Sequence, residues 1–114
     1  MATATFQQGV SSYTGTQDTV INSAAPNTAD GSNTLLNMPS ADNDAKQVLL
    51  RFDNLFSSAG GSIPDGSVIT SATVRLYITE DGTGDAYLHR ILAATWDESS
   101  TWNSLTNGIS INDV

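Results

Sequence analysis

"KQVLLRFDNL", residues 46–55, is the stretch that most directly indicates the fold of this chain. Val48, Leu50 and Phe52 alternate along it with a second set of side chains that includes Arg51. A period of two residues is typical of a β-strand, because successive side chains point to opposite faces of a sheet. The pattern predicts a strand with Val48, Leu50 and Phe52 turned toward the core and with Arg51 on the opposite face.

The same alternation recurs along the chain, most clearly in "VITSATVRLYIT", residues 68–79, where alternate residues from Ala72 to Ile78 are predicted to face inward. Gly, Pro, Asn and Asp separate these segments, and no segment has the apolar period of a helix. Strands are predicted over residues 3–8, 18–23, 33–38, 46–55, 68–79 and 86–95. Their order and spacing predict an all-β fold, an antiparallel β-sandwich of the jelly-roll type, formed by residues 1–114 as a single domain.

Composition narrows the class of partner. Charged residues make up 14% of the chain, and the formal net charge is −8. Binding to nucleic acid or to anionic lipid requires clustered cations, so neither a nucleic-acid nor a membrane partner is expected. The chain has no cysteine, so no disulfide framework is predicted. Residues 1–10 lack the basic and apolar regions of a signal peptide. If Met1 is native, the chain is expected to stay in a cytoplasm or to leave it inside a particle; if Met1 is not native, removal of a signal peptide is the alternative.

Five motifs carry a resemblance to a known family. They are "TFQQGVSSYTGTQDTVI", "PNTADGS", "LLRFDNL", "ITSATVRLYIT" and "TWDESSTWN", which succeed one another between about residue 4 and residue 103. Together they resemble the DNRLRE domain. That family is grouped with carbohydrate-binding modules, occurs as appended domains of secreted bacterial and archaeal proteins, and has relatives among phage structural proteins. The resemblance implies a jelly-roll sandwich.

The chain departs from the family pattern in two places. Family members read one residue longer between the two tryptophans, with an apolar residue where this chain has Ser100. Family domains also continue for several strands past the second tryptophan, whereas this sequence ends at Val114. The sandwich is therefore expected to lack its last strands within this chain. A longer polypeptide, a partner that supplies the strands, and a shortened sandwich are the three alternatives.

Four residues are candidates for ligand binding. Arg51 and Arg75 could join Asp53 in a charged cluster on one sheet face, where guanidinium groups would pair with the carboxylates of an acidic polysaccharide. Tyr77 and Tyr87 could add an aromatic platform for sugar rings. The alternative for Arg51, which we favour, is a structural pin that covers the sheet with its aliphatic stem. For the two tyrosines, ordinary β-propensity is likewise the explanation we favour.

The acidic loops offer a calcium site as a second hypothesis. Asp42, Asp44, Asp81 and Asp85 supply the oxygen ligands that calcium prefers, although no EF-hand loop is present. Turn formation is the explanation we favour for these aspartates, so no cofactor is predicted, and calcium is the alternative.

No residue pattern indicates catalysis. Asp97 and Glu98 are adjacent, so in an extended segment they point apart rather than flanking a glycosidic bond. His89 has no nucleophile or acid at motif spacing and is interpreted as structural. Trp96 and Trp102 are predicted to pack in the core rather than to stack on sugars. The chain is therefore predicted not to be an enzyme.

Two functions are compatible with these observations. The first is a non-catalytic structural or attachment module of a virion, such as a phage decoration, head-fibre or tail-fibre protein, that assembles with copies of itself or with other particle proteins. The alternative is an extracellular glycan-binding module of a polysaccharide-degrading enzyme or cell-surface protein.

Overall fold

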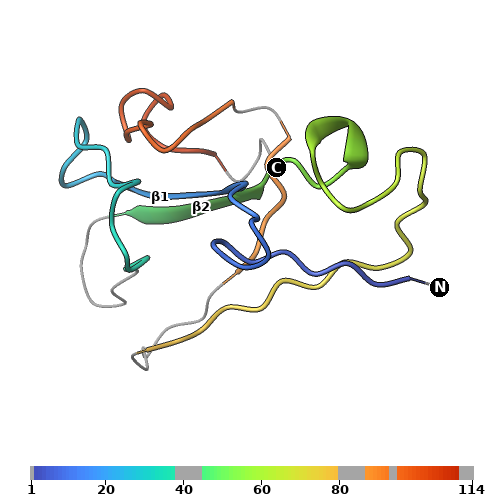
Figure 1. Cartoon of the computed structure of the whole chain (residues 1–114). Helices are drawn as coiled ribbons and strands as arrows, with labels where there is room; N and C mark the ends of the chain where they lie inside the picture. Colours follow the sequence, from blue (N-terminus) through green and yellow to red (C-terminus); the bar gives the residue numbers. More distant parts are fainter. Residues whose placement is uncertain (1, 38–44, 80–86, 93–94, 111–114) are drawn as a thin grey trace. The chain divides into compact units, whose positions relative to one another are not determined.

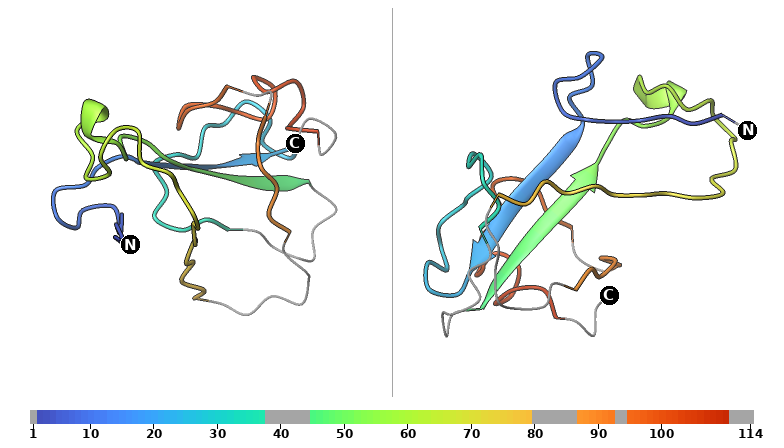
Figure 2. Two further views of the ribbon diagram at one scale, coloured as in Figure 1. Left: turned by 90° about the vertical axis from the view of Figure 1, so that its right-hand side faces the viewer. Right: turned by 90° about the horizontal axis from the view of Figure 1, so that it is seen from below.

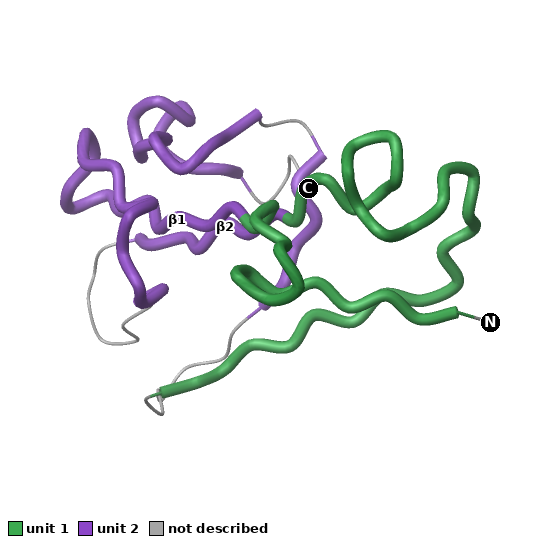
Figure 3. Tube along the Cα trace, in the orientation of Figure 1, with its two compact units in different colours: residues 1–16, 52–81 green, residues 17–51, 82–114 purple. Residues whose placement is uncertain are grey.

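The computed structural model describes residues 2–37, 45–79, 87–92 and 95–110. The chain divides into two compact units, which Figure 3 distinguishes by colour. Unit 1 consists of residues 1–16 and 52–81, and unit 2 consists of residues 17–51 and 82–114.

Two strands form an antiparallel sheet, β1 (Thr16–Asn22) and β2 (Lys46–Phe52), as Figures 1 and 2 show. Backbone hydrogen bonds flank the pair at both ends, from the Ser23 amide to the Ala45 carbonyl (3.0 Å) and from the Asp53 amide to the Gly15 carbonyl (2.6 Å). This register places Thr19 of β1 opposite Leu49 of β2. The predictions of strands over 18–23 and 46–55 are confirmed, with slightly different ends.

The hydrophobic core of unit 2 lies on one face of this sheet. Ile21 of β1 and Leu49 of β2 pack there against Trp96 and Ile109, and all four side chains are buried. Ile91, Trp102 and Leu105 are partly buried against this cluster. Thr19 shares the face and is fully buried, and its hydroxyl has no hydrogen-bond partner among the residues described.

The predicted orientation of β2 is wrong. Leu49 is the most buried residue of the strand, at 4% exposed, whereas Val48, Leu50 and Phe52 are half-buried. Arg51 therefore lies on the core face, together with Leu49, and not on the face that points away from the core. The physical reason is that the segment around Trp96 and Ile109 packs over the face that carries Leu49, where Arg51 and Gln47 hydrogen-bond its backbone, and the alternation alone does not say which face will be covered.

The remaining predicted strands are not formed within the described residues. The segments 3–8, 33–37, 68–79 and 87–92 are extended or irregular, and no ladder pairs them with a described neighbour. The predicted inward face of 68–79 is instead exposed, at 50% for Val74, 58% for Leu76 and 77% for Ile78. Alternation gives a segment the side-chain pattern of a strand. The segment forms a strand only where another strand pairs with it and a second layer packs on it. The fold is thus mostly non-helical with a two-stranded antiparallel sheet, which is consistent with the all-β class.

In unit 1, a loop from residue 56 to residue 67 is fastened to itself. A short 3₁₀ turn (Ser57–Ala59) lies within it, and a parallel bridge joins Phe56 to Ile63. The Asp65 carboxylate accepts hydrogen bonds from the Ser58 hydroxyl (2.9 Å) and the Ser58 amide (3.2 Å). These bonds hold the pKa of Asp65 below its usual value.

In the part of the chain described, no helix is long and apolar enough to cross a membrane.

Candidate functional site

Arg51 contacts the segment of unit 2 that packs over the sheet, residues 96–109. Its Nη1 atom donates a hydrogen bond to the carbonyl oxygen of Trp96 (2.7 Å), and its guanidinium carbon lies 5.1 Å from the centroid of the Trp96 ring. A guanidinium over an indole face is attracted by the ring quadrupole. The side chain thus joins the end of β2 to the core tryptophan. This geometry fits the structural alternative for Arg51, with Trp96 as a partner.

Replacing Arg51 with methionine is expected to lower the free energy of unfolding by about 1–3 kcal/mol, because the charged hydrogen bond and the cation–π contact are both lost. The matched control is Arg75→Met, which removes the same charge from an exposed side chain in segment 68–79 and is expected to change stability by less than about 0.5 kcal/mol. Urea unfolding followed by tryptophan fluorescence measures both variants. Equal losses for the two variants would contradict the role of Arg51 as a pin.

Gln47 hydrogen-bonds the other end of segment 96–109, at Ile109. Its side-chain amide donates from Nε2 to the Ile109 carbonyl (2.6 Å), and its Oε1 atom accepts from the Ile109 amide (2.8 Å). The amide therefore replaces a neighbouring strand by satisfying both backbone groups of Ile109. With Trp96 buried and Trp102 packed against the core, the prediction that both tryptophans belong to the core is confirmed.

Carboxylates cluster at the turn after Trp96. The backbone amide of Asp18, in β1, donates a long hydrogen bond (3.4 Å) to Oε1 of Glu98. Burial, together with the nearby Glu98 carboxylate, raises the pKa of Asp18. Asp97 has the opposite environment, because the Ser99 hydroxyl and amide donate to it and Arg51 lies nearby, so its pKa is lowered. A shallow hollow lined by Ala29, Gly31, Ser32, Glu98 and Ser99 adjoins the turn.

These two aspartates are expected to shift stability in opposite directions. A raised pKa means that Asp18 binds its proton more tightly when folded, so this residue makes the protein less stable as pH rises through its folded pKa. Asp18→Asn should therefore be more stable than the wild type at neutral pH, with the difference vanishing in acid. Asp97 has a lowered pKa, so its contribution is present at neutral pH and lost as pH falls. Asp97→Asn should be less stable than the wild type at neutral pH. Thermal melts across pH measure both variants. If the two substitutions changed the melting temperature in the same direction at neutral pH, the opposite pKa shifts of Asp18 and Asp97 would be contradicted.

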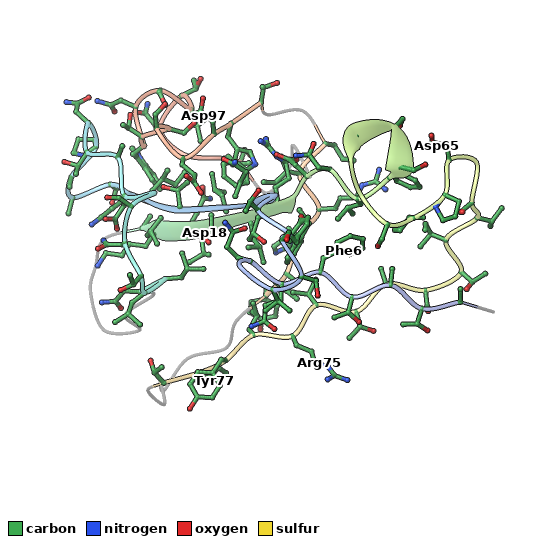
Figure 4. The ribbon with its side chains drawn as sticks, viewed as in Figure 1. Phe6, Asp18, Asp65, Arg75, Tyr77 and Asp97 are labelled. Atoms are coloured by element: carbon green, nitrogen blue, oxygen red, sulfur yellow. The ribbon has the colours of Figure 1, made fainter. Side chains whose placement is uncertain are left out.

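Two of the predicted ligand residues lie on the exposed segment of unit 1. Tyr77 is 93% exposed, and Figure 4 shows Tyr77 and Arg75 extending outward from the ribbon of residues 68–79. Tyr87 is also largely exposed but belongs to unit 2, as does Arg51. The described geometry brings Arg75 and Tyr77 onto one segment, whereas Arg51 is engaged with Trp96.

The predicted calcium ligands Asp42, Asp44, Asp81 and Asp85 lie outside the described residues. Among the residues that are described, no group of three or more His, Cys, Asp or Glu side chains could hold a metal ion. His89 is exposed and belongs to no such group.

A polar pocket of about 350 Å³ lies in unit 1, and no sequence pattern predicted it. Its walls come from the turn at residues 11–14, from Asn54, and from the loop at residues 59–62. We call it the hydroxyl pocket, because Ser11, Ser12 and Ser62 contribute to its lining. The sequence signal was present in "SSYT" and "AGGS", but these stretches resemble ordinary turns until the chain brings them together.

Comparisons with family models, with curated proteins and with solved structures found no match to this chain.

Proposed function

We propose that this protein is a non-catalytic structural or attachment module that assembles by β-strand pairing, as a decoration, head-fibre or tail-fibre component of a virion does. The supporting observation is segment 68–79, whose strand-like alternation is exposed along its whole length, from Val68 at 85% to Ile78 at 77%. Contiguous exposed apolar surface of this kind is typical of interaction sites. Pairing would satisfy the backbone of the segment and bury its apolar face.

Copies of the same chain are the proposed partner. The segment carries a single charge, Arg75, within a chain whose net charge is −8, so it contributes none of the negative charge that opposes association between copies. A closed symmetric assembly would cover the segment in every copy and would complete a jelly-roll sandwich between neighbours. The resemblance to a family with phage structural relatives supports the same proposal.

The solution mass of the purified chain, measured by light scattering, tests the proposal. We expect a discrete oligomer that dissociates on dilution. Leu76→Lys should shift it to the monomer, because a charge on the apolar face opposes pairing. Thr73→Lys, which adds the same charge on the other side of the alternation, should shift it less. A wild-type monomer at every concentration, with a cooperative melt, would contradict assembly.

A glycan-binding module is the second candidate, and the exposure of Tyr77 favours it. An aromatic ring that projects into solvent is suited to stacking on a sugar ring. If this function holds, binding to an immobilised polyuronate such as alginate should be lost in Tyr77→Ala and kept in the control Thr79→Ala. Unchanged binding in Tyr77→Ala, or none in the wild type, would exclude this use of Tyr77.

A further inference from the structure

The register of the sheet determines which backbone groups point outward. At its two ends, Ser23 pairs with Ala45 and Asp53 pairs with Gly15 through backbone hydrogen bonds. In an antiparallel pair of strands, residue pairs that exchange hydrogen bonds alternate with pairs that do not. The even-numbered residues of β1 and β2 therefore direct their amides and carbonyls to the two outer edges of the sheet.

The outer edge of β1 is closed by side chains. The amide of Thr16 donates a hydrogen bond to Oε1 of Gln8 (3.1 Å), and the amide of Asp18 donates to Oε1 of Glu98 (3.4 Å). Each oxygen takes the place of a carbonyl from a neighbouring strand. Charged side chains at a strand edge also oppose pairing with another chain, and the Glu98 carboxylate is such a group.

The outer edge of β2 has a different environment. Among the described residues the sheet has no third strand, and no hydrogen bond engages the outward amides and carbonyls of Val48 and Leu50. The side chains of Val48, Leu50 and Phe52 are half-buried in a row on the face that points away from the core. This edge therefore offers unpaired backbone groups beside an apolar row, which is a template for the addition of a strand.

Segment 68–79 has the matching pattern. Its even-numbered apolar residues, from Ala72 to Ile78, alternate with the period of a strand and are exposed. Placed beside Val48 and Leu50, they would extend the apolar row and remove both surfaces from water. Within one copy of the chain, segment 68–79 is not paired with β2, so the added strand would come from another copy.

The distribution of charge favours the same pairing. The chain contains 12 Asp and Glu residues, which oppose the association of copies. Neither β2 nor segment 68–79 contains any of them, whereas the edge of β1 carries Asp18 and Glu98. We propose that segment 68–79 of one copy adds as a strand to the outer edge of β2 in a second copy. This inference rests on the assembly proposed above and identifies the edge that accepts the segment; reciprocal addition would close a symmetric dimer.

Because the chain has no cysteine, this pairing can be trapped by engineered disulfides. One chain carries Leu50→Cys, and a second chain carries one cysteine in segment 68–79, so only a contact between copies forms the mixed disulfide. Neighbouring side chains on one face of paired strands lie close enough for that bond. Val48→Cys tests the same edge again. The matched control is Asp18→Cys, because Asp18 lies directly opposite Leu50 on the same face but belongs to β1. The segment variants are Ala72→Cys, Val74→Cys, Leu76→Cys and Ile78→Cys.

Mild oxidation should give a disulfide-linked dimer between a β2 variant and at least one segment variant, and none with Asp18→Cys. Equal cross-linking to Asp18→Cys would overturn the proposal. Segment variants that cross-link only to themselves would also overturn it, because segment would then pair with segment. If the wild type forms the expected oligomer but neither β2 variant cross-links, the accepting edge is wrong and assembly stands. A monomeric wild type contradicts the assembly and this inference with it.

The closure of the β1 edge has its own test. Glu98→Ala removes the acceptor of the Asp18 amide, so this edge can pair with the β1 edge of another copy. The mass of the oligomer in light scattering should then rise about twofold or more. Glu98→Gln removes the same charge but keeps an acceptor oxygen, and its oligomer should keep the wild-type mass. A wild-type mass for Glu98→Ala would contradict the closure of β1 and with it the selection of β2.

Discussion

Replacing Trp96 with alanine is expected to lower the free energy of unfolding by about 3–5 kcal/mol, the largest effect of any single substitution in unit 2. The indole is 6% exposed and packs with only three other buried apolar residues, Ile21, Leu49 and Ile109. Its loss removes the cation–π partner of Arg51 as well. A core of this size has few other contacts with which to fill the cavity.

Trp96→Phe is the matched control for this substitution. It keeps an aromatic ring in the core and should cost clearly less than the alanine variant. Urea unfolding followed by far-ultraviolet circular dichroism measures both, because the fluorescence of Trp96 is itself removed. A urea unfolding curve for Trp96→Ala that overlays the wild-type curve would mean that Trp96 does not organise this core.

Gly108→Ala is expected to cost about 2–4 kcal/mol, because two penalties add at this position. The backbone of Gly108 is left-handed, with φ of 87°, and a Cβ atom there would lie 2.7 Å from the Trp102 ring. That distance is well inside van der Waals contact, so the ring would have to shift away from the core. The Gly108 amide also donates to the Trp102 carbonyl (3.0 Å), which limits how far the backbone can yield.

Gly60 separates the two penalties. Its φ of 89° is nearly the same, but a Cβ atom at this position would meet nothing within 4 Å. Gly60→Ala should therefore show the conformational cost alone, about 1 kcal/mol. Thermal unfolding of the two variants gives the difference directly. If Gly60→Ala cost as much as Gly108→Ala, the contact with Trp102 would contribute nothing.

Local pattern was a good guide wherever a segment met a partner in the described structure. The alternation in residues 46–55 and in residues 18–23 predicted two strands, and these are the two that pair. Both tryptophans were correctly assigned to the core, since large apolar side chains have the most to gain from burial. The all-β class also agrees with the mostly non-helical structure.

The same pattern failed where tertiary contact decides the outcome. Segment 68–79 has the clearest alternation in the chain, yet it stays unpaired among the described residues, because pairing depends on an available edge and not on the segment itself. The hydroxyl pocket could not be predicted either, since residues 11–14 lie at least forty positions from the other lining residues, 54 and 59–62. Three of its lining residues, Ser11, Ser12 and Asn54, have positive φ angles, which the sequence does not indicate.

Short windows of sequence were enough to establish the strand character of β1 and β2, the burial of the tryptophans and the acidic, cysteine-free composition. Local sterics and hydrophobicity control these properties, so no distant part of the chain is needed to predict them. The orientation of β2 is different, because Leu49 and Arg51, and not Val48 and Leu50, face the core. The more apolar face of β2, with Val48, Leu50 and Phe52, is not the one that the Trp96–Ile109 segment covers, so long-range packing and not the local pattern decides the orientation.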